Sequence, residues 1–403
     1  MGANVETPSA QPAISIAGCG AVTALGSGVE PLEKALLANA SGLRPCEKLA
    51  GKGYQSTVAG MVPEKILDQL RSDDPAHADA RAFLLVDAVL QQAEKSAAAV
   101  LKGVPPSRRG LVLSTTKADI EALERAFRRE PCSTAARRHI QPALLAADVA
   151  AAREIRGVVQ CVSAACISGL LAIQQGATLI RRGQADLVFV AGVDLVSHFV
   201  LSGFTTLKSL DPEGCRPFDR ARVGLSLGEG AGALVLVRQA GELPDSILVR
   251  GWGTSNDANH LTGPSRDGSG LAMAISRALA KAGVSADQID YVHTHGTGTV
   301  YNDAMESHAL RAVFGERVPP FSSCKGMLGH TLGAAGILET ILCQIAMRVA
   351  MLPGTPRLRE PDPGSPSSLL ANPQPATRLR TILKVNCGFG GTNAAVVLQK
   401  CDE

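Results

Sequence analysis

Cys166 is the residue whose type and surroundings most directly suggest covalent chemistry. It lies in VSAACISG, after the apolar run IRGVVQCV and before ISGLLAIQQGATLIRRG, in which apolar residues recur at helical spacing. Gly183 marks the predicted end of that helix. Cys166 is therefore predicted at a strand-to-helix turn, where free N–H groups and the helix dipole favour a thiolate. A buried structural cysteine is the competing interpretation.

Two glycine-rich stretches nearer the C-terminus contain histidines. HTHGTGT places His293 and His295 two residues apart, so they share one face if this segment is a strand. KGMLGHTLGAAG carries Lys325 and His330, with His330 just before a predicted helix. These histidines could instead be structural, bonded at a strand end or a helix entry. Together with Cys166 they fit nucleophilic catalysis or a zinc site, and spacing alone leaves both open.

Composition indicates a globular protein and excludes several functional classes. The chain has 403 residues, 45% hydrophobic and 19% charged, which is typical of a protein with a large core. Its net charge of +3 is too small to indicate nucleic-acid binding. We find no apolar run near the ~20 residues that span a membrane, and no signal peptide. Ten cysteines without a C-x-x-C pair predict a reduced, cytoplasmic protein.

Predicted strands alternate with predicted helices, which indicates an α/β architecture. The pattern restarts at Ile247, where ILVRGWGTSNDA loosely echoes ISIAGCGAVTAL from Ile14. We therefore predict two α/β halves, residues 14–245 with the nucleophile and residues 246–403 with both histidines. The clearest strand-like runs are 14–22, 109–116, 185–193 and 232–238, and the clearest helical run is 81–101.

Five stretches occur in an order and at a spacing typical of one family: SAACISG, RPFDRARVGLSLGEGAG, YVHTHGTGT, SSCKGMLGHTLGAAG and NCGFGGTN. With them the chain resembles a β-ketoacyl-acyl carrier protein synthase of the elongating branch, which has a Cys-His-His triad. The resemblance covers nearly the whole chain, from about Ile14 to Gln399. It implies a thiolase-like duplicated α/β fold of five layers, αβαβα, and a dimer. It also implies an acyl carrier protein as partner.

Residue roles follow from the same resemblance. Cys166 corresponds to the nucleophile, and His295 and His330 to the paired histidines. Lys325 and Glu339 correspond to the supporting ion pair, and Asp303 and Glu306 to the acidic residues that follow the histidine turn. Thr297 and Thr299 correspond to the threonines that bind the phosphopantetheine arm. Phe389 corresponds to the gating phenylalanine, whose N–H helps form the oxyanion hole, and Lys208 to a basic residue that contacts the acidic carrier protein. The resemblance implies no metal and no bound cofactor, since the phosphopantetheine arrives on the carrier protein.

The resemblance also separates related functions. Initiating synthases use Cys-His-Asn and thiolases a second late cysteine, whereas His330 stands here in a GH-x-x-GAAG setting. We expect decarboxylative Claisen condensation of an acyl thioester with malonyl-acyl carrier protein, in fatty acid or specialised polyketide or polyene synthesis. The alternative is a non-catalytic or weakly active chain-length-type subunit of a ketosynthase heterodimer. STTKADI, from Ser114, replaces a glycine-rich stretch of the family, so the acyl substrate stays open.

Overall fold

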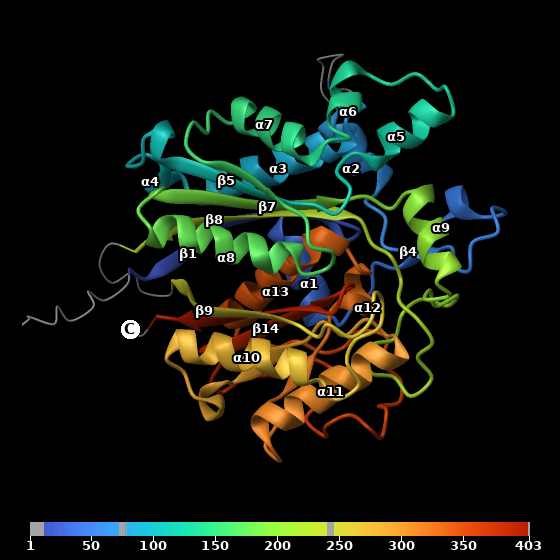
Figure 1. Ribbon diagram of the computed structural model, residues 1–403, viewed down its shortest axis with the longest axis vertical. Coiled ribbons are helices and arrows are strands. Elements are labelled where there is room, and N and C mark those ends of the chain that lie inside the picture. The colour runs from blue at the N-terminus through green and yellow to red at the C-terminus, as the bar shows by residue number, and fades with distance from the viewer. Residues whose placement is uncertain (1–11, 72–76, 78, 240–245, 402–403) are drawn as a thin grey trace, which may run out of the picture.

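The protein forms five layers, in which two layers of strands alternate with three of helices (Figure 1). The structure is a computed structural model that describes residues 12–71, 77, 79–239 and 246–401. Its layer order is the αβαβα order predicted above. The principal helices are α3 (Arg81–Ser96) and α7 (Pro142–Ala152) on one outer face, α8 (Ser168–Arg181) and α13 (Ala335–Val349) in the middle, and α10 (Ser269–Ala282) and α11 (Val300–Phe314) on the other face.

The strand order repeats between the two β layers. The first layer runs β6 (Val159–Val162), β5 (Arg109–Ser114), β7 (Leu187–Asp194), β8 (Gly230–Arg238), β1 (Ile14–Thr23). The second runs β11 (Phe321–Ser322), β10 (Tyr291–His293), β14 (Thr381–Gly388), β15 (Thr392–Lys400), β9 (Ile247–Asn256). In each layer the first three strands are parallel and the last three antiparallel to their neighbours. This repeat accounts for the sequence echo, because β1 and β9 are equivalent strands.

A short pairing between β1 and β9 joins the two layers into one eleven-stranded hydrogen-bonded sheet. The boundary predicted at residues 245/246 adjoins residues 240–245, which lie outside the described part of the chain, and it stays a prediction.

The smaller elements are β2 (Gly26–Ser27), β3 (Arg44–Pro45), β4 (Val58–Ala59), β12 (Met351–Leu352), β13 (Gln374–Pro375), α1 (Val29–Leu37), α2 (Glu64–Leu70), α4 (Ala98–Leu101), α5 (Ile120–Phe127), α6 (Thr134–Arg138), α9 (His198–Thr206), α12 (Lys325–Leu328) and the 3₁₀ turns η1 (Glu47–Leu49), η2 (Pro106–Arg108), η3 (Ala286–Gln288) and η4 (Leu332–Ala334).

Most predicted elements form where local sequence places them. Every residue of β7 is buried, as expected of a strand covered by helices on both faces. Gly183 follows α8 with φ at 68°, a left-handed conformation that ends helices. The helix predicted over 81–101 is instead broken at Ala97 into α3 and α4. There the Ser96 hydroxyl accepts the N–H of Cys19 and ties the end of α3 to β1.

The stretch Leu332–Val349 is the one candidate, among the described residues, that is long and apolar enough to cross a membrane. Within the protein 83% of it is buried, as is usual for a core helix. It includes α13, which lies against α8 in the middle layer.

Glycines bring the two central helices into close contact. A Cβ added to Gly169 would lie 2.9 Å from the backbone of Gly336, closer than real Cβ contacts allow. A Cβ on Gly336 would lie 2.6 Å from the amide nitrogen of Leu170. Because α8 follows Cys166 and α13 follows His330, this backbone contact brings the two candidate catalytic turns together.

Candidate active site

Cys166 lies in the turn between β6 and α8, as predicted. The preceding Ala165 has a left-handed φ of 47°, a strained conformation for a residue with a side chain. The Ser168 hydroxyl holds the turn, since it accepts the N–H of Ala164 (2.8 Å) and donates to the carbonyl of Ala165 (2.6 Å). Gly388 lies against this turn, because a Cβ there would be 3.3 Å from the Cys166 nitrogen. The nucleophile turn is therefore braced by the β14–β15 turn.

Both predicted histidines meet the cysteine. His330 Nε2 lies 2.9 Å from Cys166 Sγ, and one ring nitrogen of each histidine and the sulfur lie within 4.8 Å of one another. The two imidazole rings are nearly perpendicular, with centroids 5.1 Å apart. The N–H of His330 donates to Ser226 O (2.7 Å), which places this histidine against the chain segment before β8. All three groups are buried, so their chemistry is shielded from water.

His295 lies in a turn rather than on a strand. β10 ends at His293, so the expectation that His293 and His295 share one strand face is wrong. The physical cause is the turn at Gly296, whose φ of 42° leaves the β region. A Cβ on Gly296 would lie 2.4 Å from that of Ser323, so a side chain does not fit there.

Hydrogen bonds fix which nitrogen of each imidazole carries the proton. His330 Nδ1 accepts the N–H of Leu332 (3.2 Å). His295 Nδ1 accepts from the Asn386 amide (2.9 Å) and faces Lys325 Nζ at 3.4 Å. Burial, followed by the charge of Lys325, holds the pKa of both histidines well below the usual value. Both rings are therefore neutral, and their protons lie on Nε2.

A buried carboxylate organises the charges behind the histidines. Glu339 forms ion pairs with Lys325 and with Lys384, the latter at 2.9 Å. The Asn386 amide bridges Glu339 Oε2 (2.9 Å) and His295. Burial acts to raise the pKa of Glu339, but the two ammonium groups outweigh it and hold that pKa below its usual range. Although burial disfavours its charge, the pKa of Lys325 is raised because Glu339 stabilises the ammonium.

The thiol of Cys166 does not titrate as the sequence predicted. Burial raises its pKa to about 11, against smaller lowering effects of Lys325, Lys117 and the Phe389 N–H. The expectation of a lowered pKa from the helix N-terminus is wrong here, because desolvation of the buried sulfur is the larger effect. The resting site thus contains a neutral thiol and two neutral imidazoles.

Two carboxylates hold the turn that carries His295. Glu306 accepts the N–H groups of His295 (2.7 Å) and Gly296 (2.6 Å). Asp303 accepts those of Thr297 (3.0 Å) and Gly298 (3.1 Å). Burial raises the pKa of both carboxyls, that of Glu306 to about 7. Both residues project from the first turns of α11, so that helix positions the histidine turn.

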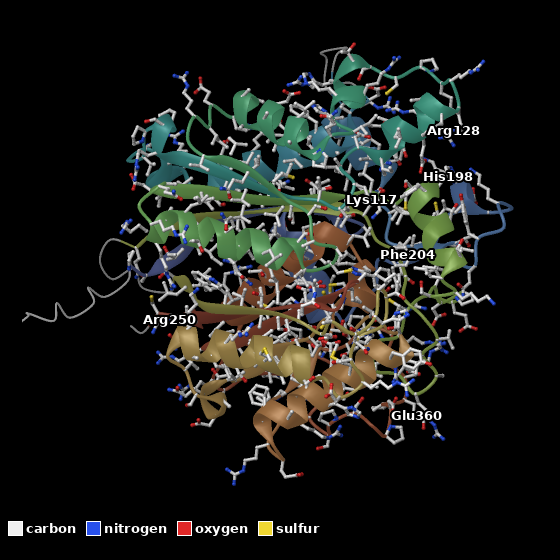
Figure 2. All side chains as sticks on the ribbon, in the orientation of Figure 1. Lys117, Arg128, His198, Phe204, Arg250 and Glu360 are labelled. Carbon is white, nitrogen blue, oxygen red and sulfur yellow. The ribbon has the colours of Figure 1, made fainter. Side chains whose placement is uncertain are left out.

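The remaining predicted residues are Thr297, Thr299, Phe389 and Lys208. Thr297 and Thr299 hydroxyls are 2.9 Å apart, with Thr299 partly exposed. The ring of Phe389 is 37% exposed and contacts Phe204 of α9 at a centroid distance of 5.8 Å. Lys208 is exposed just beyond the end of α9. Figure 2 places Phe204 on the side of the molecule that carries α9.

The three central residues do not fit a metal site. A histidine that binds a metal presents an unprotonated nitrogen, while its other N–H donates to a carboxylate or carbonyl. Here each Nδ1 faces a donor instead, so each Nε2 carries the proton. Cys166, His295 and His330 are close enough to suggest zinc, but their hydrogen bonds favour proton donors over ligands.

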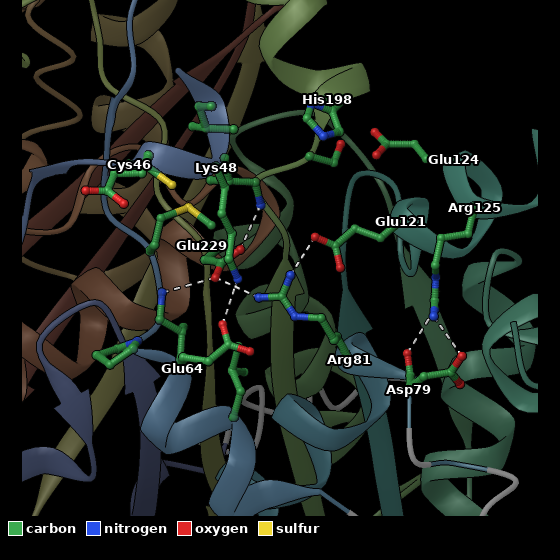
Figure 3. Close-up of a pocket in the computed structure, with 18 of the residues that line it drawn as sticks. Cys46, Lys48, Glu64, Asp79, Arg81, Glu121, Glu124, Arg125, His198 and Glu229 are labelled. Carbon is green, nitrogen blue, oxygen red and sulfur yellow. Dashed lines mark hydrogen bonds and ion pairs between the residues drawn. The ribbon is translucent and has the colours of Figure 1, made fainter. Parts of the chain in front are cut away.

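A cavity of about 1090 Å³ lies apart from these residues (Figure 3). Many of its charged side chains are paired with one another. Arg81 bonds Glu229 (2.8 Å) and Glu121 (2.5 Å), and Arg125 bonds Asp79 (2.7 Å). Its size alone therefore does not make it the candidate active site, because Cys166, His295 and His330 are not among the residues that line it.

Comparison with known proteins identifies the family. The profile described as "Beta-ketoacyl synthase, N-terminal domain" matches residues 11–241, and "Beta-ketoacyl synthase, C-terminal domain" matches residues 247–359. The chain belongs to the β-ketoacyl synthase family. As a β-ketoacyl synthase it is an acyltransferase of the 3-oxoacyl-[acyl-carrier-protein] synthase type, related to enzymes of fatty acid and polyketide synthesis.

Similar sequences include two named synthases. The tetracenomycin polyketide synthase ketoacyl synthase alpha subunit of Streptomyces glaucescens is 32% identical, with 98% of this chain and 99% of the relative covered. 3-Oxoacyl-[acyl-carrier-protein] synthase 2 of Coxiella burnetii is 29% identical, with 96% of this chain and 98% of the relative covered.

Solved structures of the same fold include two ketosynthase assemblies. The ishigamide ketosynthase/chain length factor matches with a TM-score of 0.88 and 31% identity, over 98% of this chain and all of that chain. A ketosynthase in complex with its chain length factor from Xenorhabdus doucetiae matches with a TM-score of 0.85 and 28% identity, over all of both chains.

Sequence reasoning missed two residues of the site, Lys384 and Asn386. They alternate along β14 and are both buried in an otherwise apolar strand. That alternation was a usable signal, since a buried lysine needs a partner. The partner could not be predicted, because Glu339 lies on α13, far away in sequence.

Iodoacetamide should alkylate Cys166 increasingly fast from pH 7 to pH 9.5, by about tenfold per pH unit. The reason is that burial holds the thiol pKa near 11, so the thiolate fraction still rises throughout this range. Peptide mass spectrometry would follow Cys166 separately from the other cysteines. A plateau below about pH 8 would contradict this account, because it would show a thiolate already formed at neutral pH.

Proposed function

We propose that this chain is a catalytic, elongating ketosynthase that condenses an acyl group on Cys166 with malonyl-acyl carrier protein. The observation that supports this most strongly is one sulfur between two imidazoles with their protons on Nε2. This arrangement offers a nucleophile for a thioester and two donors for a thioester oxygen.

In the first step the Cys166 sulfur attacks the acyl thioester, and the carrier thiol leaves with the proton. The N–H of Phe389 lowers the pKa of the Cys166 thiol. Together with the N–H of Cys166, it would stabilise the oxyanion. The turn around Ala165 fixes the cysteine in place, so little reorganisation is needed when the intermediate forms.

In the second step malonyl thioester loses carbon dioxide and becomes an enolate. The Nε2–H groups of His295 and His330 donate to the enolate oxygen, which carries the developing charge. A neutral imidazole donates a hydrogen bond from its one N–H without giving up the proton. Burial beside Lys325 keeps both rings in that neutral state. The carbanion then attacks the acyl carbonyl on Cys166. Exclusion of water protects the carbanion from protonation.

Carrier binding follows from the residues around the entrance. Thr297 and Thr299 are the hydroxyls for the phosphopantetheine arm, which arrives on acyl carrier protein, so no bound cofactor is needed. The Phe389 ring gates the entrance, and the exposed Lys208 contacts the acidic carrier. The enzyme works in the cytoplasm, in keeping with ten unpaired cysteines. It assembles as a homodimer or with a related ketosynthase-like subunit.

The second candidate is a non-catalytic or weakly active, chain-length-type partner subunit in such a heterodimer. It is favoured by the two structural neighbours that are ketosynthase/chain length factor assemblies. The presence of Cys166 beside His295 and His330 favours the catalytic role, since a partner that only shapes a pocket does not need this constellation.

Cys166→Ala should abolish acyl-enzyme formation and condensation but leave release of carbon dioxide from malonyl-carrier protein. His295→Ala should slow that release by about 10²–10³-fold, because the enolate loses a donor in a dry site. The acyl group should still transfer to Cys166 in the His295→Ala variant. The measurements are carbon dioxide release from labelled malonyl-carrier protein and intact-mass detection of the acyl-enzyme.

The unmutated protein is the reference for both variants. If it neither acquires an acyl group nor releases carbon dioxide with any medium or long acyl donor, the catalytic proposal fails and the partner subunit remains. Bound zinc that is lost in either variant would contradict the hydrogen-bond assignment as well.

Lys208→Glu should raise the KM for acyl carrier protein while leaving turnover of a small pantetheine thioester nearly unchanged. The effect should shrink as salt rises, because exposed charges are screened beyond about 8–10 Å. Lys102→Glu is the matched control, since Lys102 is an exposed lysine next to α4, on the other side of the molecule from α9 (Figure 1). Equal loss on both substrates, or the same loss in the control, would refute docking at Lys208.

A further inference from the structure

Lys384 is a buried ammonium beside the active site to which the reaction above assigns no role. It stands on β14 between the apolar residues Leu383 and Val385 and is completely buried. Its Nζ pairs with Glu339 of α13 at 2.9 Å and also donates to the carbonyl of Val385. Burial of a lysine is unfavourable unless the ammonium is paired and hydrogen-bonded. The presence of this lysine therefore calls for an explanation beyond packing.

Neutralisation of Glu339 does not account for Lys384, because Lys325 already supplies a positive charge. Lys325 forms its ion pair with carboxylate oxygen Oε1, whereas Lys384 uses Oε2. Among the residues that the structure describes, Glu339 is the one carboxylate in an ion pair with either ammonium. The cluster thus contains two cations and one anion, so Lys384 adds a charge that this carboxylate does not need. What Lys384 contributes besides the charge is a set of further hydrogen bonds.

The further hydrogen bonds of Lys384 go to the chain segment that leads into His295. Its Nζ donates to the carbonyls of His293 and Thr294, both at 3.4 Å. Lys325 Nζ donates to the carbonyl of His295 itself at 3.1 Å. Three consecutive carbonyl groups therefore bind two ammonium groups that share one carboxylate on α13. Through Lys384, the end of β10 is tied to α13.

The next part of the same turn is held by anions. Glu306 and Asp303 of α11 accept the N–H groups of residues 295–298. The N–H groups of the turn thus bind carboxylates, and the carbonyl groups that precede them bind ammonium groups. Without Lys384 the carbonyls before His295 would lose their ammonium partner, and the turn would be held mainly from the α11 side.

We propose that Lys384 is a positioning residue for His295, which holds the turn so that the Nε2–H of the histidine points at the enolate oxygen. In the part of the chain that the structure describes, none of the ion pairs and hydrogen bonds of Lys384 reaches Cys166 or His330. The inference rests on the proposed function for the step that uses the enolate. Such a step depends steeply on the position of the donor, since a misplacement of about 1 Å can cost about 10²-fold in rate.

The test separates the step that uses His295 from the step that does not. Lys384→Met keeps an unbranched side chain but removes the ammonium. With malonyl-carrier protein it should lower kcat for release of carbon dioxide by about 10- to 100-fold at nearly unchanged KM. Acyl transfer to Cys166, followed by intact mass, should keep the rate of the unmutated protein. Lys384→Gln, which also lacks the charge but stays polar, should show the same division between the steps and serves if the first variant does not fold.

Val385→Ala is the matched control, because it removes buried volume from the next position of β14 and leaves every charge in place. It should leave kcat for release of carbon dioxide nearly unchanged. Nitrogen-15 NMR of the histidines adds a readout that does not depend on activity. The side-chain signals of His295 should shift or broaden in Lys384→Met and stay in place in Val385→Ala.

Two outcomes would overturn the inference. Unchanged release of carbon dioxide in both Lys384 variants would show that the ammonium does not position His295. Equal loss of carbon dioxide release and acyl transfer, in these variants and in Val385→Ala alike, would show that Lys384 only stabilises the fold. If the unmutated protein releases no carbon dioxide, the proposed function fails, whereas His295 signals that move only in the Lys384 variants still support positioning by Lys384.

Discussion

The buried carboxylate of Glu339 is the interaction on which the rest of the active site depends. It forms ion pairs with two ammonium groups, Lys325 and Lys384, in the buried interior, and it accepts a hydrogen bond from the amide of Asn386. Removing one partner of such a buried pair costs about 3–5 kcal/mol, because a charge is left uncompensated. Lys325 and Asn386 in turn face Nδ1 of His295 and leave its proton on the opposite nitrogen.

This arrangement explains why a strongly charged cluster produces neutral reacting groups. The lysines lie behind the imidazoles, where their charge and the loss of water both oppose protonation of the rings. In His330 the proton is also left on Nε2, because the backbone N–H of Leu332 donates to its Nδ1. Helices α8 and α13 meet at Gly169 and Gly336. Because each helix follows one of the two candidate catalytic turns, this contact brings Cys166 and His330 together.

Local sequence was sufficient to predict the turn at Cys166, the end of its helix at Gly183 and the duplicated α/β order, since these depend on spacing within a few residues. Local sequence could not predict features that depend on contacts between segments far apart in the chain. The thiol pKa depends on burial in the folded protein, and Lys384 on β14 pairs with Glu339 on α13, which lies in a different layer. His295 was placed on a strand because alternation cannot show where β10 ends. The family resemblance supplied the long-range pairing of Cys166 with the histidines, which spacing could not.

The central claim is that His295 and His330 are both neutral, with the proton on Nε2, before substrate binds. Nitrogen-15 NMR of protein labelled in its histidines tests this most directly, with His295→Gln and His330→Gln to assign the signals. At neutral pH we expect an unprotonated Nδ1 and a protonated Nε2 for both residues, unchanged down to about pH 6 because their pKa values are held well below the usual value. A protonated Nδ1 in either residue, or an imidazolium at neutral pH, would contradict the account.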